Sequence, residues 1–171
     1  GARNSFITAL GIPITFAITF MIMEAYGESL NGNSLFALVM VLGMIVDHAI
    51  VIIENAYRHR QLGLSPSEAA IVGTDEVVKP VISGTLTTIA AFLPMMLLPG
   101  IMGKFMRIIP IVTCVALVAS TLEALIFLPS HFAEWGSNAK EFKQGFIGRW
   151  QEQFRALLAT VYRHRYITLF V

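Results

Sequence analysis

Residues 43–55 read GMIVDHAIVIIEN, an apolar run with one aspartate and one histidine near its centre. Its apolar part continues toward the N-terminus, so that the whole apolar segment covers residues 34–53. As a helix it is long enough to cross a bilayer core of about 30 Å. A charge inside such a segment costs roughly 2.5–3.5 kcal/mol to insert, so Asp47 is the first candidate for a functional residue.

Three further stretches have the same length and apolar character, at residues 6–23, 81–98 and 108–128. The chain is 56% hydrophobic and 13% charged, with a mean hydropathy of +0.70. Soluble domains carry about 25% charged residues. Because backbone polar groups in lipid must be satisfied within their own segment, we expect helices here and not strands. The sequence predicts an all-α integral membrane protein with four transmembrane helices.

The basic residues lie mainly on one side of these spans. Arg3 precedes the first span, three basic residues fall in the predicted loop 58–79, and six follow the fourth span. Only Lys104 and Arg107 lie on the other side. The positive-inside rule therefore places residue 1, the loop and everything after residue 130 in the cytoplasm.

A different kind of helix is predicted after the four-helix transmembrane region, which we assign to residues 1–133. Apolar residues recur there at helical spacing, at Phe142, Phe146, Trp150, Phe154, Leu157 and Val161. We expect residues 134–163 to form an amphipathic helix at the cytoplasmic face of the membrane, or else to pack on a soluble domain. Residues 164–171 are predicted to start a further transmembrane helix, and both ends are expected to continue in a longer protein.

Asp47 is the candidate proton carrier, and we expect it to be the deepest formal charge of the chain. Desolvation disfavours an ionised carboxylate, whereas a nearby cation favours it. A carboxylate held between these influences can titrate within a physiological range, as proton-coupled transport needs. The alternative is a protonated aspartate that only forms a hydrogen bond with a neighbouring helix.

Four other residues are weaker candidates. His48 lies about 100° around the helix from Asp47, and either relays a proton or forms hydrogen bonds in the bundle. Glu54, Glu123 and Thr87 are candidates for a polar path. Each also has a structural interpretation. Glu54 would anchor a helix end, Glu123 would form a hydrogen bond between spans, and Thr87 would form one with its own helix backbone.

Several other functions have no support in the sequence. The net charge is +1 and no basic cluster is interleaved with aromatic residues, so we expect no nucleic-acid partner. The single Cys114 cannot form an internal disulfide. The G-x-G-D and H-E-x-x-H motifs of intramembrane proteases are missing. We therefore expect a protein that is not an enzyme and that has no metal site and no cofactor.

The segment 43–55 closely resembles the fourth-span signature of exporters of the resistance-nodulation-division (RND) family, G-x-x-V-D-D-A-I-V-x-x-E-N. Residues 63–70, GLSPSEAA, resemble the family's cytoplasmic loop, and residues 85–94, TLTTIAAFLP, its fifth span. Residues 128–129 resemble the end of its sixth span, and residues 6–23 then correspond to its third. The resemblance covers nearly the whole chain in order.

This resemblance implies a fragment of a twelve-span transporter in the bacterial inner membrane, built from two six-span halves. It implies export of drugs or other small molecules, driven by the proton-motive force. Its implied partners are the remaining half, which carries a lysine that pairs with the aspartate, and a homotrimer joined to a periplasmic adaptor and an outer-membrane channel. His48 stands where many members have a second aspartate, which leaves the coupled ion and the proton stoichiometry open.

Three alternatives remain beside a multidrug exporter. A Sec-type protein-export auxiliary subunit shares the V-D motif, but such subunits end it with an F-E-R-type sequence instead of the Ile53-Glu54-Asn55 found here. A lipid-exporting or metal-exporting relative of the superfamily is the second. A structural membrane anchor without transport is the third, and such an anchor would not need Asp47.

Overall fold

A computed structural model of the chain describes residues 2–136 and 146–164. The chain divides into two units, Gly1–Ala139 and Lys140–Val171. The helices of the first unit are α1 (Ala2–Ala25), α2 (Gly32–Gln61), α3 (Pro66–Phe92), the 3₁₀-helix η1 (Leu93–Leu97), α4 (Gly100–Met106), α5 (Ile108–Leu122), the π-helix η2 (Glu123–Phe127) and α6 (Leu128–Trp135). The second unit contains α7 (Phe146–Arg163). No strand occurs in the described ranges, so the prediction of an all-α fold is confirmed.

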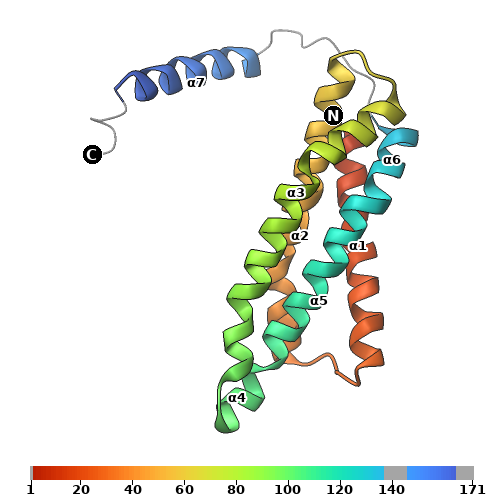
Figure 1. The fold of residues 1–171 in the computed structure, drawn as a ribbon, viewed down its shortest axis with the longest axis vertical. Coiled ribbons are helices and arrows are strands. Elements are labelled where there is room, and N and C mark those ends of the chain that lie inside the picture. The colour runs from red at the N-terminus through yellow and green to blue at the C-terminus, as the bar shows by residue number, and fades with distance from the viewer. Residues whose placement is uncertain (1, 137–145, 165–171) are drawn as a thin grey trace. The chain divides into compact units, whose positions relative to one another are not determined.

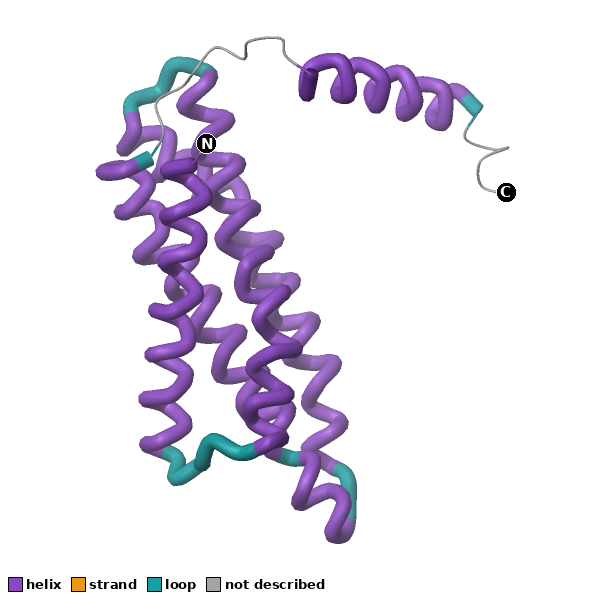
Figure 2. Tube along the Cα trace, turned by 180° about the vertical axis from the view of Figure 1, so that it is seen from behind, coloured by secondary structure: helices purple, strands orange, loops and turns teal. Residues whose placement is uncertain are grey.

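The first unit is an up-and-down bundle (Figure 1). Helices α1, α2 and α3 and the continuous run α5–η2–α6 pack side by side, and each runs opposite to the one before it (Figure 2). Four helical stretches are long and apolar enough to cross a membrane, as predicted: Arg3–Ala25, Gly32–Gln61, Pro66–Leu97 and Gly100–Trp135. The start of α1, the α2–α3 link and α6 lie at one end of the bundle, which is the arrangement that the positive-inside rule requires.

The link between α2 and α3 is much shorter than predicted. Only residues 62–65 are non-helical, so the expected loop 58–79 is wrong. Ser65 Oγ accepts a hydrogen bond from the Glu68 N–H at 3.3 Å, and the Glu68 carboxylate accepts one from the Ser65 N–H at 3.0 Å. This capping box, with Pro66 in the first turn, begins α3 well before its apolar part. The length of an apolar stretch predicts which residues can lie in lipid. The capping residues instead predict where the helix begins.

The fourth span also extends beyond its predicted range of 108–128. The helix continues to Trp135, with the π-helix η2 inserted between α5 and α6. A π-helix has i→i+5 hydrogen bonds, is rare, and is frequently found at functional sites. This one begins at Glu123, a residue already singled out in the sequence.

Small residues let α2 and α3 approach closely near the link. A Cβ atom on Gly73 would lie 2.6 Å from the Ala56 Cα and 2.7 Å from the Ala56 N, so the two helix backbones touch at this point. Ala56, Ala69 and Ala70 are buried around the contact. Small residues commonly line such close contacts between membrane helices.

Polar bonds secure the same ends of the two helices. The Glu76 Oε2 of α3 lies 2.8 Å from the Arg58 Nη2 and 3.0 Å from the His59 Nε2 of α2. Asn55 donates from its Nδ2 to the same oxygen at 2.9 Å and to the Gly73 carbonyl at 2.7 Å. These bonds fix α2 and α3 relative to each other, outside the predicted apolar spans 34–53 and 81–98.

The second unit contains a helix where an amphipathic one was predicted. Among the described side chains of α7, the apolar Trp150, Phe154, Leu157 and Val161 are exposed. Residues 137–145 lie outside the described residues, and so do residues 165–171, where the start of a further span was predicted. The domain boundaries, and the placement of α7 at the membrane surface, stay predictions.

Candidate functional site

Asp47 lies near the middle of α2 and faces away from the bundle. Its side chain is exposed, as are Gly43, Ile50 and Glu54 on the same helical face. The buried face of α2 lies on the other side, at residues such as Ile45 and Ala49. No ion pair with Asp47 occurs among residues 2–136 and 146–164. The described part of the chain thus supplies the acid on this helix, and no lysine or arginine is paired with it.

The side chain of His48 lies about 100° around α2 from Asp47 and takes part in a polar contact that joins three helices. Its Nδ1 lies 3.3 Å from the Ser120 Oγ of α5, and its Nε2 lies 3.3 Å from the Thr85 Oγ1 of α3. The Thr85 Oγ1 lies 2.9 Å from the Thr121 Oγ1 of α5. We call His48, Thr85, Ser120 and Thr121 the hydroxyl cluster.

The hydroxyls of this cluster also reach backbone carbonyls. Thr85 donates to the Val81 carbonyl at 3.0 Å, and Ser120 donates to the Ile45 carbonyl at 3.3 Å. While both hydroxyls donate to carbonyls, both ring nitrogens of His48 face acceptors, which suits a doubly protonated ring. A neutral ring needs one hydroxyl to turn and donate to it. The cluster can therefore accommodate either protonation state through the rotation of one hydroxyl group.

Ser120 and Thr121 were missed as site residues from the sequence. The available signal was a pair of adjacent hydroxyl side chains in an otherwise apolar span, which can bond neighbouring helices. Nothing in the sequence shows which helix they face. Their partnership with His48, 72 positions away in the case of Ser120, comes from the packing of α2 against α5.

Glu123, and not Asp47, is the most buried carboxylate of the described residues. Its side chain is 2% exposed and packs against Gly11 of α1. Burial within the bundle is a different property from depth along a span, so the expectation that Asp47 is the deepest charge stays a prediction. The sequence pattern gives the position of a residue along its span, and it does not show which way the side chain faces.

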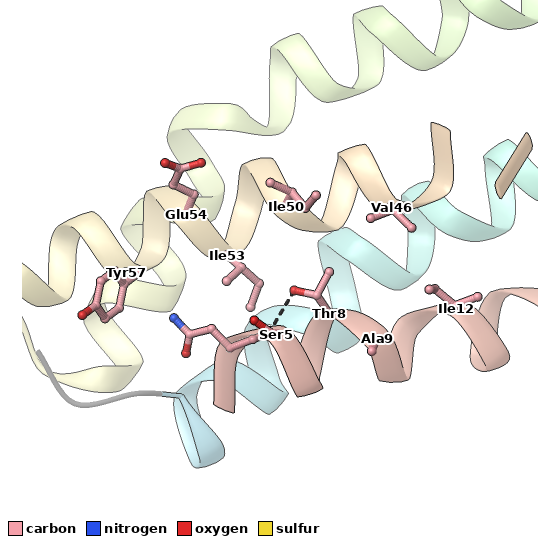
Figure 3. A pocket seen from close by; sticks show the side chains of 10 residues that line it. Ser5, Thr8, Ala9, Ile12, Val46, Ile50, Ile53, Glu54 and Tyr57 are labelled. Atoms are coloured by element: carbon pink, nitrogen blue, oxygen red, sulfur yellow. Dashed lines mark hydrogen bonds between the residues drawn. The ribbon is translucent and has the colours of Figure 1, made fainter. Parts of the chain in front are cut away.

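Glu54 lines a groove between α1 and α2 with a volume of about 510 Å³. Figure 3 shows Thr8, Ala9 and Ile12 of α1 along one side, and Ile50 with Glu54 along the other. The groove is mostly apolar, apart from Glu54 and a few small polar side chains near the start of α1.

The structure does not bring the residues of the predicted polar path together. Thr87 is exposed on α3 and donates to the Ser83 carbonyl at 2.8 Å, a bond within its own helix. Glu54 lies in the groove and Glu123 lies inside the bundle. No hydrogen bond links these three residues within the described ranges, and the path stays a prediction.

The sequence of the chain matches a known protein family and is similar to several multidrug resistance proteins. Residues 1–170 match the sequence model of the AcrB/AcrD/AcrF family. The chain is 40% identical over 127 residues to the multidrug resistance protein MdtC of Escherichia coli O139:H28, a match that covers 74% of this chain and 12% of that protein. MdtC of Salmonella arizonae and MdtC of Shigella flexneri are each 39% identical over the same length and shares. The chain spans about an eighth of the length of these relatives.

Proposed function

We propose, because the chain belongs to the AcrB/AcrD/AcrF family, that it is part of a bacterial inner-membrane transporter that exports drugs in exchange for protons. Its similarity to multidrug resistance proteins supports drugs as the exported class. Family membership favours an exporter over the Sec-type auxiliary subunit and over a structural anchor. We propose no covalent chemistry and no cofactor, since the proton gradient supplies the energy.

The exposed Asp47 at the middle of α2 is the observation that carries proton coupling. An ionised carboxylate at membrane depth needs a cation, whereas the neutral acid can lie against apolar groups. The described part of the chain has no cation paired with Asp47, so we assign that partner to the rest of the transporter. Protonation then selects between two packings of the exposed α2 face, which is the conformational change that transport requires.

The hydroxyl cluster gives His48 a role beside Asp47. A proton that reaches the ring can be accommodated by hydroxyl rotation, without a movement of α2, α3 or α5. We assign His48 to proton relay between Asp47 and the interior of the bundle. From the family resemblance we further propose that the complete protein forms a homotrimer with a periplasmic adaptor and an outer-membrane channel.

Drug export by the full-length transporter should depend on a pH gradient. In vesicles that contain the purified transporter, an imposed gradient should drive export of a fluorescent drug, and a protonophore should stop it within the measurement. Vesicles without protein are the control. Export that persists after the gradient has collapsed, or that requires ATP, would contradict proton coupling.

His48→Ala should change the pH dependence of export. Histidine can gain or lose a proton close to physiological pH, so we expect the pH profile of export by the variant to differ in shape from the wild-type profile. The matched control is His131→Ala, which removes a histidine that stacks on Trp135 and lies outside the hydroxyl cluster. A His48→Ala profile that superimposes on the wild-type profile at normal abundance would remove His48 from the relay.

A further inference from the structure

The carboxyl group of Glu123 is buried, and one of its oxygen atoms has no partner in the described part of the chain. Its side chain is 2% exposed, and its Oε1 atom has no hydrogen-bond partner among the described residues. Buried polar atoms in folded proteins are nearly always bonded, so an unpaired one calls for an explanation. A buried carboxyl group without a compensating partner favours its neutral form, because burying the charge without compensation is very costly.

Helix α1 closes directly on this carboxyl group. A Cβ atom on Gly11 would lie 2.8 Å from the Glu123 Oε2 and 3.0 Å from its Oε1, so the absence of a side chain at Gly11 makes the approach possible. One turn further along α1, Thr15 is fully buried and its Oγ1 also lacks a partner. The contact leaves no space at Gly11 for a hydration shell around an ionised carboxylate.

Within the described residues, no charge of opposite sign is paired with Glu123. The π-helix η2 packs against α1, α2, α5 and α6. The titratable groups on these helices that are at least partly buried are His48, Tyr57, His59, Arg60, Cys114 and His131. None of these groups forms a hydrogen bond or ion pair with Glu123 in the described ranges. His48 lies in the hydroxyl cluster and His59 contacts Glu76. Arg60 donates a hydrogen bond to the Leu64 carbonyl. The remaining charged side chains on the four helices are exposed.

We propose that Glu123 is a second proton-binding carboxylate of the transporter, and that its bound proton is what allows α1 to close on η2 at Gly11. Asp47 faces out of the bundle from α2, whereas Glu123 lies inside it beside α1. Release of the proton from Glu123 would require α1 to withdraw or water to enter. The π-helix starts at this residue, and the irregular backbone there is suited to such an adjustment.

The neutral acid can be detected directly by infrared difference spectroscopy on the full-length protein in membranes. At neutral pH we expect a carbonyl stretching band of a protonated carboxylic acid. Glu123→Gln should remove it, whereas Glu24→Gln, at an exposed carboxylate of α1, should leave it unchanged. The band should also persist in Asp47→Asn, so the outcome does not depend on whether Asp47 couples export. A spectrum unchanged by Glu123→Gln would overturn the proposal.

Two further variants test the packing and guard against misfolding. Gly11→Ala should shift the band, because the added Cβ would lie 2.8 Å from the Glu123 Oε2 and must displace the carboxyl group. If Glu123→Gln does not assemble, Glu123→Asp keeps the acid on a shorter side chain and should shift the band instead of removing it. A band that is identical in Gly11→Ala and the wild type would refute the assigned contact with α1.

Discussion

Replacing Asp47 with asparagine should abolish drug export by the full-length transporter, down to the level of cells that lack it. Asparagine has nearly the same shape as aspartate, but it cannot ionise, so the exposed face of α2 can no longer alternate between a charged and a neutral state. The side chain is exposed and makes no ion pair within the described part of the chain. We therefore expect membrane insertion and abundance to remain near the wild-type level.

The measurement is drug efflux from cells that contain equal amounts of each variant. Glu24→Gln is the matched control, because it also neutralises an exposed carboxylate on a membrane helix, at the end of α1 and away from Asp47. Efflux from Asp47→Asn cells that equals the wild-type rate would rule out Asp47 as the coupling residue. Loss of efflux in both variants would point to a general sensitivity to charge.

Gly73→Leu should prevent stable assembly of the bundle. A Cβ at this position would already lie 2.6 Å from the Ala56 Cα and 2.7 Å from the Ala56 N, and these backbone atoms cannot move away by changing a rotamer. Overpacking typically costs about 1–3 kcal/mol, and a contact with the backbone of the neighbouring helix should fall at or above the upper end of that range. The change would also disturb the bonds from Asn55 to the Gly73 carbonyl and to Glu76.

Thermal unfolding in detergent and the amount of protein in the membrane both report this effect. Gly73→Ala should fall between the wild type and Gly73→Leu, since its gain in helix propensity of about 1 kcal/mol offsets part of the clash. Gly84→Leu is the control on the same helix, where an added Cβ meets nothing within 4 Å. Equal losses at Gly73 and Gly84 would show that the close approach of α2 and α3 is not the cause.

The sequence alone determined the features that depend on short stretches of chain. The four apolar lengths, the side on which basic residues gather, and the depth of Asp47 within its span all follow from local composition and spacing. These features are local because a helix in lipid satisfies its own backbone and needs only length and apolarity to cross. The start of α3, which replaces most of the expected loop 58–79, could also be predicted from the capping box at Ser65 and Glu68.

Only the tertiary structure decided which way the site residues face and what they touch. Asp47 and His48 are neighbours in sequence, yet one is exposed and the other contacts Thr85 and Ser120. A helix sets the angle of about 100° between consecutive side chains, but its rotation about its own axis is fixed by the helices packed against it. Glu123 shows the same dependence. Its burial against Gly11 joins two positions 112 residues apart, and the absent side chain of one helix determines the environment of an acid on another.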